Sequence, residues 1–172
     1  MQIKISKTLD SIISEVVFTV SKDPVHRALK DQLAVAILRH KGSLAHQILS
    51  TRLHRWQIQQ IALLIEQQAT ITPEENVYPE KFFRKFRDEL LADYTAEALN
   101  SPAHSPINFQ WGITTCHALA AIANDPATAT VRAIKRYGLS PERLLADAHH
   151  FASRRISLAA KPRNLNWSDY TQ

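Results

Sequence analysis

The residues best suited to chemistry in this chain are its single cysteine, Cys116, and the adjacent His117. A thiolate activated by an imidazole can act as a nucleophile, but the two groups must face each other. Both residues lie in a run of strong helix formers. Neighbouring residues of a helix point about 100° apart, so this pair does not face each other. We therefore predict that Cys116 is a small, partly buried residue and that His117 is structural.

The spacing of the histidines and carboxylates offers neither a metal site nor an acid–base pair. The eight histidines stand at positions 26, 40, 46, 54, 104, 117, 149 and 150. No two are three or four residues apart, and H-E-x-x-H is absent, so no helix face presents paired imidazoles. Glu89, Asp93 and Glu97 form an acidic stripe typical of a solvated helix face. The chain also lacks G-x-x-x-x-G-K-[ST], so we predict no catalytic residue, no cofactor site and no enzymatic activity.

The basic residues raise the possibility of an acidic partner. The net charge is +5 with neutral histidines, which favours encounter with an acidic molecule. Arg132, Lys135 and Arg136 share one face of a predicted helix, and residues 81–87 hold a second basic group. No recognition-helix or RNA-binding motif accompanies them. Nucleic-acid binding is therefore the alternative function, and a protein partner is preferred.

Two aromatic residues are candidates for contact with a partner. Phe109 and Trp111 lie in a predicted loop, residues 100–111, that contains two prolines. An aromatic side chain exposed on a loop is well suited to bind a partner. The phenylalanines of residues 82–86 instead recur at helical spacing, which is typical of a packed core.

Periodic apolar residues predict an all-α fold of about eight helices. Leu9, Ile13 and Val16, for example, recur at three and four residues, and no long strand-like alternation interrupts the pattern. A hydrophobic content of 45% indicates a globular chain with a real core, and no apolar run approaches membrane-spanning length. The predicted helices span about residues 6–20, 24–38, 44–49, 56–68, 80–99, 115–123, 126–137 and 141–152.

Start and stop signals set the expected ends of these helices. Ser6 and Thr114 are good N-caps. Asp125 and Pro126 are expected to cap and begin the helix that follows them, as Asp23-Pro24 and Ser140-Pro141 do for two others. Gly138 is expected to end a helix in the left-handed conformation.

The chain contains an internal repeat. The segments 32–53 and 117–139 align at an offset of 85 residues, the difference between positions 36 and 121. Ala36 then falls on Ala121 and Ile37 on Ile122, and apolar pairs continue through both segments. The predicted unit is two helices that meet at a corner.

This unit resembles the Clp N-terminal repeat. Residues 115–126, TCHALAAIANDP, are similar to its usual T-E-H-L-L-L-A-L-L motif followed by a D-P-like turn, and residues 30–38 resemble the same motif in a first copy. Ala133-Ile134 and Gly138-Leu139 match the V-L…G-V that follows it. The resemblance covers about residues 6–151. Its order, spacing and duplication point to the N-terminal domain of the ClpA- and ClpC-type ATPases.

The resemblance implies one compact domain made of two four-helix repeats related by a pseudo-twofold axis. Each repeat would then supply one of the two aligned segments. The expected organisation is a first repeat at 1–68, a connection at 69–79, a second repeat at 80–158, and a tail or linker at 159–172.

The resemblance also implies a function. Such domains bind protein substrates or adaptors for an unfoldase, so this chain would be the N-terminal domain of an ATP-dependent Clp protease ATP-binding subunit, or a stand-alone modulator of such a machine. In the ClpC branch, the acidic residue of the motif helps to bind phosphoarginine. The matching positions are Asp31, which keeps the charge, and Cys116, which does not. We expect a cytoplasmic monomer without a membrane segment.

Overall fold

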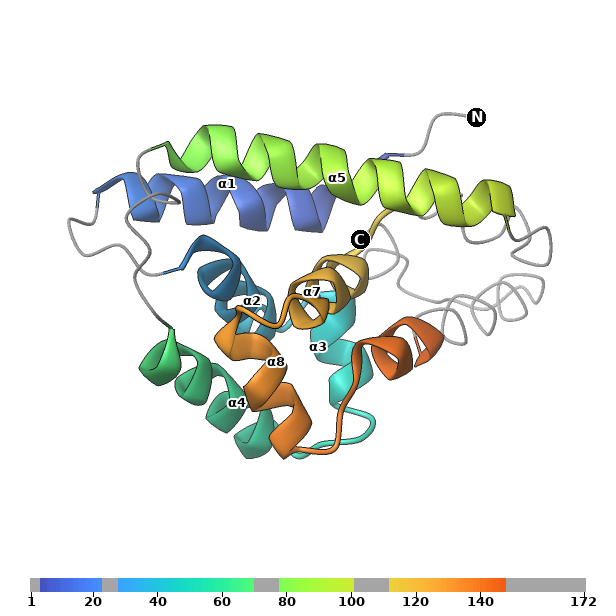
Figure 1. The fold of residues 1–172 in the computed structure, drawn as a ribbon. Coiled ribbons are helices and arrows are strands. Elements are labelled where there is room, and N and C mark those ends of the chain that lie inside the picture. The colour runs from blue at the N-terminus through green and yellow to red at the C-terminus, as the bar shows by residue number, and fades with distance from the viewer. Residues whose placement is uncertain (1–3, 23–27, 70–77, 101–111, 148–172) are drawn as a thin grey trace, which may run out of the picture.

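The computed structural model describes residues 4–22, 28–69, 78–100 and 112–147. The described chain is all-α, as predicted (Figure 1). Its described residues form the seven helices given below, and residues 141–147 form one further helical segment. None of the described helices combines the length and apolar composition that crossing a membrane requires. The helices are α1 (Lys7–Lys22), α2 (Leu29–Arg39), α3 (Leu44–Leu49), α4 (Arg55–Gln68), α5 (Pro79–Asn100), α7 (Thr115–Asn124) and α8 (Ala129–Arg136).

The two longest helices, α1 and α5, lie side by side along one edge of the molecule (Figure 1). The Ser6 hydroxyl accepts a hydrogen bond from Leu9 N at 3.2 Å, which confirms the predicted cap of α1. Arg87 of α5 pairs with Asp10 of α1 at 3.1 Å. Both side chains are well exposed, so the pair adds little stability and the apolar faces hold the helices together.

A short extended bridge ties the start of α1 to the start of α7. Ser6 N donates to Ile113 O at 2.9 Å, and Ile113 N donates to Lys4 O at 2.8 Å. Gly112 has a φ of +68°, a conformation that residues with a Cβ adopt at a cost. The bridge therefore sets two helix N-termini beside each other.

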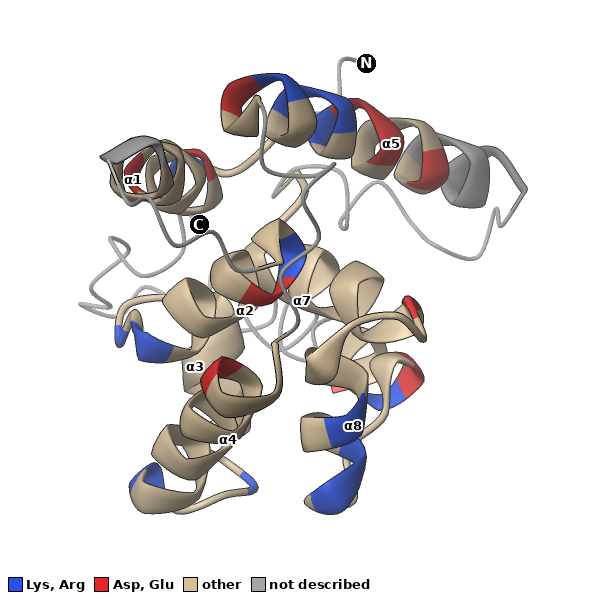
Figure 2. Ribbon diagram, turned by 60° about the vertical axis from the view of Figure 1, so that its left-hand side comes forward, with Lys and Arg blue, Asp and Glu red and all other residues tan. Residues whose placement is uncertain are grey.

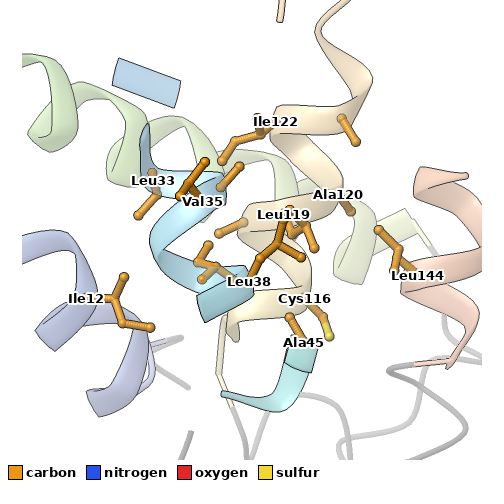
Figure 3. Packing of buried hydrophobic residues seen from close by; sticks show 14 of the residues in the cluster. Ile12, Leu33, Val35, Leu38, Ala45, Cys116, Leu119, Ala120, Ile122 and Leu144 are labelled. Atoms are coloured by element: carbon orange, nitrogen blue, oxygen red, sulfur yellow. The ribbon is translucent and has the colours of Figure 1, made fainter. Parts of the chain in front are cut away.

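The core is organised around α2, which packs against α1, α3, α4, α7 and α8. Leu33 and Ile37 of α2 and Leu119 of α7 are fully buried. Because α7 is apolar almost all round, it lies inside the molecule rather than on its surface. Figure 3 shows core side chains from α1, α2, α3, α7 and the 141–147 segment meeting there: Ile12, Leu33, Val35, Leu38, Ala45, Cys116, Leu119, Ala120, Ile122 and Leu144.

The corners that follow α2 and α7 share one hydrogen-bond pattern. The Ser43 hydroxyl donates to Ile37 O at 3.1 Å, and the Thr128 hydroxyl donates to Ile122 O at 3.0 Å. Each hydroxyl reaches a carbonyl six residues upstream. The two pairs are separated by the same 85 residues that align the sequence segments.

The helix after each corner is capped by the central helix of the other segment. Ala45 N, in the first turn of α3, donates to the Thr115 hydroxyl of α7 at 3.0 Å. The first turn of α8 donates to Asp31 of α2: Ala129 N at 3.1 Å, Thr130 N at 3.0 Å and the Thr130 hydroxyl at 2.7 Å. Side chains distant in the sequence therefore satisfy backbone donors that would otherwise be buried without an acceptor.

Replacing Thr115 with valine is expected to lower the free energy of unfolding by about 1–3 kcal/mol. The side chain is fully buried, so its nearly isosteric replacement removes the acceptor and leaves the Ala45 amide without one. Thr51→Val is the control, because Thr51 is exposed and only donates to a carbonyl of its own turn. If urea unfolding showed the same loss of unfolding free energy in both variants, the hydrogen bond from Ala45 to Thr115 would not stabilise the fold.

Two predicted helix starts are wrong. The helix expected to begin at Pro126 begins at Ala129, because Asp31 takes the amides of that turn while Asp125 closes a turn with Ala127 N at 3.0 Å. The helix expected from Pro24 begins at Leu29, since Ala28 has an extended ψ of 122°. Asp23 and Pro24 lie outside the described residues.

Other predicted ends are confirmed. Gly138 has a φ of +73° after α8. Thr114 is the N-cap residue of α7. Ser140 accepts a hydrogen bond from Arg143 N at 3.2 Å, and the helical segment begins at Pro141.

Candidate functional site

A groove of about 430 Å³ lies between α1, α2 and the end of α4. Its walls are partly apolar because α1 and α2 turn the edges of their buried faces toward it. Such a mixture of apolar walls and a few polar groups is typical of a binding site. The apolar side chains lining it include Ile12, Val16, Val35 and Ile65.

The charged groups of the groove are mostly acidic. Glu15, Asp31 and Glu66 supply three carboxylates, and Arg39 supplies one guanidinium, which gives a formal net charge of −2 with His40 neutral. Arg39 pairs with Glu66 through two contacts of 2.6 and 2.9 Å. Glu15 is exposed and is the carboxylate most accessible to a ligand. The groove is therefore suited to an apolar segment that carries a cationic side chain.

Asp31, a predicted partner-binding residue, lines this groove but is only 2% exposed. Its two oxygens accept the three hydrogen bonds from α8 described above. A ligand would compete with those bonds for direct contact. Asp31 therefore contributes negative charge to the groove wall and, in this structure, caps α8.

Cys116, the second position matched by the resemblance, does not line the groove. Its side chain is fully buried among the core residues of Figure 3. Burial is the main reason that the pKa of the Cys116 thiol lies far above its ordinary value, with a smaller contribution from Asp147. The thiol therefore stays protonated and presents neither a nucleophile nor a negative charge.

His117 takes part in the start of α7. Its Nδ1 accepts a hydrogen bond from Thr114 N at 2.9 Å and lies 2.9 Å from the Thr114 hydroxyl. Its ring meets that of Tyr94 edge to face, with centroids 4.6 Å apart. These contacts fix the ring between α5 and α7, away from the groove-lining residues.

The other predicted site residues divide into two groups. Phe109 and Trp111 lie outside the described residues. Arg132, Lys135 and Arg136 are all exposed on α8, which Figure 2 shows as a strongly basic helix. Among the described residues, no group of three or more histidine, cysteine and carboxylate side chains is arranged to hold a metal ion.

Three charged residues of the groove were not identifiable from the sequence: Glu15, Arg39 and Glu66. They come from three helices that are distant in the sequence and meet only in the fold. The only local signal is Glu15, an acidic residue placed beside the apolar stripe of α1.

Comparisons with known protein families, with curated proteins and with solved structures found no match for this chain. What bears on function is therefore the groove, the surface charges and the resemblance carried by the sequence.

Proposed function

We propose that this chain is a non-catalytic receptor domain of the Clp N-terminal type, which binds protein substrates or adaptors for a Clp unfoldase. It would act as the N-terminal domain of a longer ATPase or as a stand-alone modulator. The observation that carries the proposal is the groove between α1, α2 and α4, because its walls and charge suit a protein segment. The all-α fold and the order of its helices agree with the proposal.

Two matched corners support the two-repeat organisation that the resemblance implies. Ser43 and Thr128 make equivalent hydrogen bonds at the same offset that aligns the sequence. Thr115 and Asp31 then cap the opposite helices in a reciprocal way. Reciprocal contacts of this kind are what an approximate twofold relation between two similar units produces.

The proposed ligand is a protein segment with apolar and cationic side chains. Apolar side chains would cover the accessible edges of Val16 and Val35, and a cation would approach Glu15 at the exposed rim. A receptor for an unfoldase must also release its ligand, so modest affinity is expected. A small groove offers a bound segment few anchoring contacts, which agrees with modest affinity.

Glu15→Lys is expected to weaken binding of a peptide that alternates arginine and leucine by about tenfold. The substitution changes the formal charge of the groove from −2 to 0 and places a cation where the ligand needs an anion. Glu142→Lys is the matched control, because Glu142 is exposed and does not line the groove. Fluorescence anisotropy at one salt concentration measures the affinity of both variants for the peptide. Equal losses of affinity would exclude the groove as the binding site.

The identity of the partner is determined in the source cells. The native gene product is captured with an antibody, its intact mass is measured, and its co-purifying proteins are identified. A mass near 19.5 kDa together with a captured Clp unfoldase would indicate a stand-alone modulator. A much larger chain would indicate a domain of the ATPase itself. Recovery of no unfoldase, adaptor or unfolded client would contradict the proposal.

The exposed basic face of α8 supports one alternative, a regulator that binds nucleic acid. Arg132, Lys135 and Arg136 could contact consecutive phosphates. The logarithm of the binding constant would then fall linearly with the logarithm of the salt concentration, with a slope that corresponds to several neutralised phosphates. Failure of DNA and RNA to bind at low salt would exclude this alternative.

A further inference from the structure

The C-terminal part of the chain contains a short segment whose composition complements the groove. Residues 148–172 lie outside the described residues, but their composition is known from the sequence. Within them, residues 154–163 read RRISLAAKPR. This stretch combines four cationic side chains with the large apolar side chains of Ile156 and Leu158, and it contains no carboxylate. We call residues 154–163 the tail segment.

The shape of the groove suits a short segment of chain. α1 contributes positions 12, 15, 16 and 19 to its walls, and α2 contributes positions 31, 32, 35, 36 and 39. Each row follows one face of its helix over a length of about 11 Å. Four residues of extended chain span about 13 Å. A groove of about 430 Å³ and this length therefore accepts a few residues with one or two large apolar side chains.

The charge of the groove favours a cationic occupant. Two of its carboxylates already have partners, since Asp31 accepts hydrogen bonds from α8 and Glu66 pairs with Arg39. Glu15 is exposed at the rim. Among the described residues, no lysine or arginine forms an ion pair with Glu15. A lysine or arginine of an occupant would therefore find a carboxylate at the rim that can accept it.

We propose that the tail segment occupies the groove of its own chain and competes there with external ligands. Ile156 and Leu158 would cover the accessible edges of Val16 and Val35, and a flanking cation would approach Glu15. This inference rests on the proposed function, because it concerns the regulation of the same site. The groove would stay covered until a segment that binds more tightly displaces the tail.

The other segments outside the described residues do not match the groove. Residues 70–77 contain two glutamates and no lysine or arginine, and residues 23–27 carry one aspartate against one arginine. Residues 1–3 and 101–111 contain no lysine, arginine, aspartate or glutamate. An acidic groove with apolar walls therefore favours the tail segment over all of them.

The tail is long enough to reach the groove within one chain. The last described residue is Asp147, whose Oδ1 accepts a hydrogen bond from Arg52 Nη2 at 2.6 Å. Figure 1 shows the 141–147 segment across the molecule from the end of α4, so the tail must cross about the width of the domain. A compact domain of this size is about 35 Å wide. From Asp147, an extended chain reaches about 30 Å at Ile156 and about 50 Å at Arg163.

Tethering makes even a weak contact effective. A short linker gives the tail segment an effective concentration on the order of millimolar at the groove. With a dissociation constant of the same order, the tail covers the groove in roughly half of the molecules or more. The apparent affinity of an external ligand falls in proportion to the fraction of open molecules. Release of the tail should therefore strengthen the binding of an external peptide by about twofold to fivefold.

The first test measures this competition in the full chain, with the peptide that alternates arginine and leucine and fluorescence anisotropy as the readout. Arg155→Glu with Lys161→Glu is expected to strengthen peptide binding by about twofold to fivefold, because the reversed charges repel the acidic groove. Lys135→Glu with Arg136→Glu is the matched control. It makes the same charge change on the exposed face of α8 and should alter the affinity by less than about 1.5-fold at physiological salt.

A second double variant separates apolar contact from charge. Ile156→Ser with Leu158→Ser removes the two large apolar side chains of the tail segment and leaves the net charge unchanged. It should also strengthen peptide binding by about twofold to fivefold, because the tail loses its contacts with the groove walls.

A nitroxide label shows directly where the tail segment lies. Cys116 is fully buried, and burial raises the pKa of its thiol, so a cysteine introduced by Ser157→Cys takes the label alone. The amide signals of Val16 and Val35 should lose intensity relative to the same chain with a diamagnetic analogue of the label. Adding Glu15→Lys should restore much of that intensity, since the tail then meets a cation at the rim.

Several results would overturn the inference. They are unchanged peptide affinity in both tail variants, an equal gain in the α8 control, or intensity losses away from the groove. Intensity loss in an isotope-labelled chain mixed with a separate chain that carries the nitroxide would make a second copy the occupant, which also overturns it.

Failure of this inference is distinguishable from failure of the proposed function. If Glu15→Lys still weakens the external peptide while both tail variants bind it like the parent, only the role of the tail segment is excluded. If neither the parent nor the tail variants bind the peptide, the proposed function of the groove fails as well.

Discussion

Asp31→Ala is expected to lower the free energy of unfolding by about 3–5 kcal/mol. The carboxylate is 2% exposed and accepts three hydrogen bonds from the first turn of α8. Its removal leaves two backbone amides and one hydroxyl without their acceptor, in residues that are at most 1% exposed. This loss is a large fraction of the stability of an ordinary domain. Urea unfolding followed by circular dichroism measures it.

Two further variants make this prediction specific. Asp10 also lies in the first turn of its helix, but it is exposed and pairs only with Arg87. Asp10→Ala should therefore cost less than about 1 kcal/mol. Asp31→Asn keeps one acceptor oxygen and should fall between the two alanine variants. Similar stabilities for Asp31→Ala and Asp10→Ala would show that Asp31 does not hold α8 in place.

Gly112→Ala is expected to lower the free energy of unfolding by about 3 kcal/mol. A Cβ at this position would lie 2.0 Å from Lys4 O, and the backbone has a φ of +68°. Lys4 cannot move away freely, because the same carbonyl accepts the hydrogen bond from Ile113 N. The substitution should therefore open the bridge between the starts of α1 and α7.

Gly138 provides a control with the same backbone conformation. Its φ is +73°, but a Cβ would meet no atom within 4 Å. Gly138→Ala should therefore cost only the left-handed backbone penalty, about 1 kcal/mol. Thermal and urea unfolding of the two variants separate backbone strain from steric overlap. If Gly138→Ala were as damaging as Gly112→Ala, the bridge would not be the cause.

Helices and most of their ends could be predicted because their signals are local. The apolar stripe of α1, the cap at Ser6 and the left-handed Gly138 depend on residues a few positions apart. The start of α8 could not be predicted in this way. Its amides are taken by Asp31, nearly a hundred residues upstream, and Asp125 and Pro126 gave a strong but misleading local signal.

The candidate site was less predictable than the fold. Asp31 was identified from a motif, but its burial against α8 follows from packing that the motif does not describe. Glu15 and Glu66 approach the same groove only because α1 and α4 both pack on α2. Charge at a surface formed by distant helices has no signature in a single segment of sequence. Phe109 and Trp111 remain predictions.

The most direct test of the account is a chemical-shift map of the full chain titrated with the peptide that alternates arginine and leucine. The account predicts that shifts concentrate on residues lining the groove, with Val16, Val35 and Ile65 among them, and that Glu15→Lys weakens them. Saturable binding elsewhere, or no change at millimolar peptide, would contradict the claim that this groove receives protein segments.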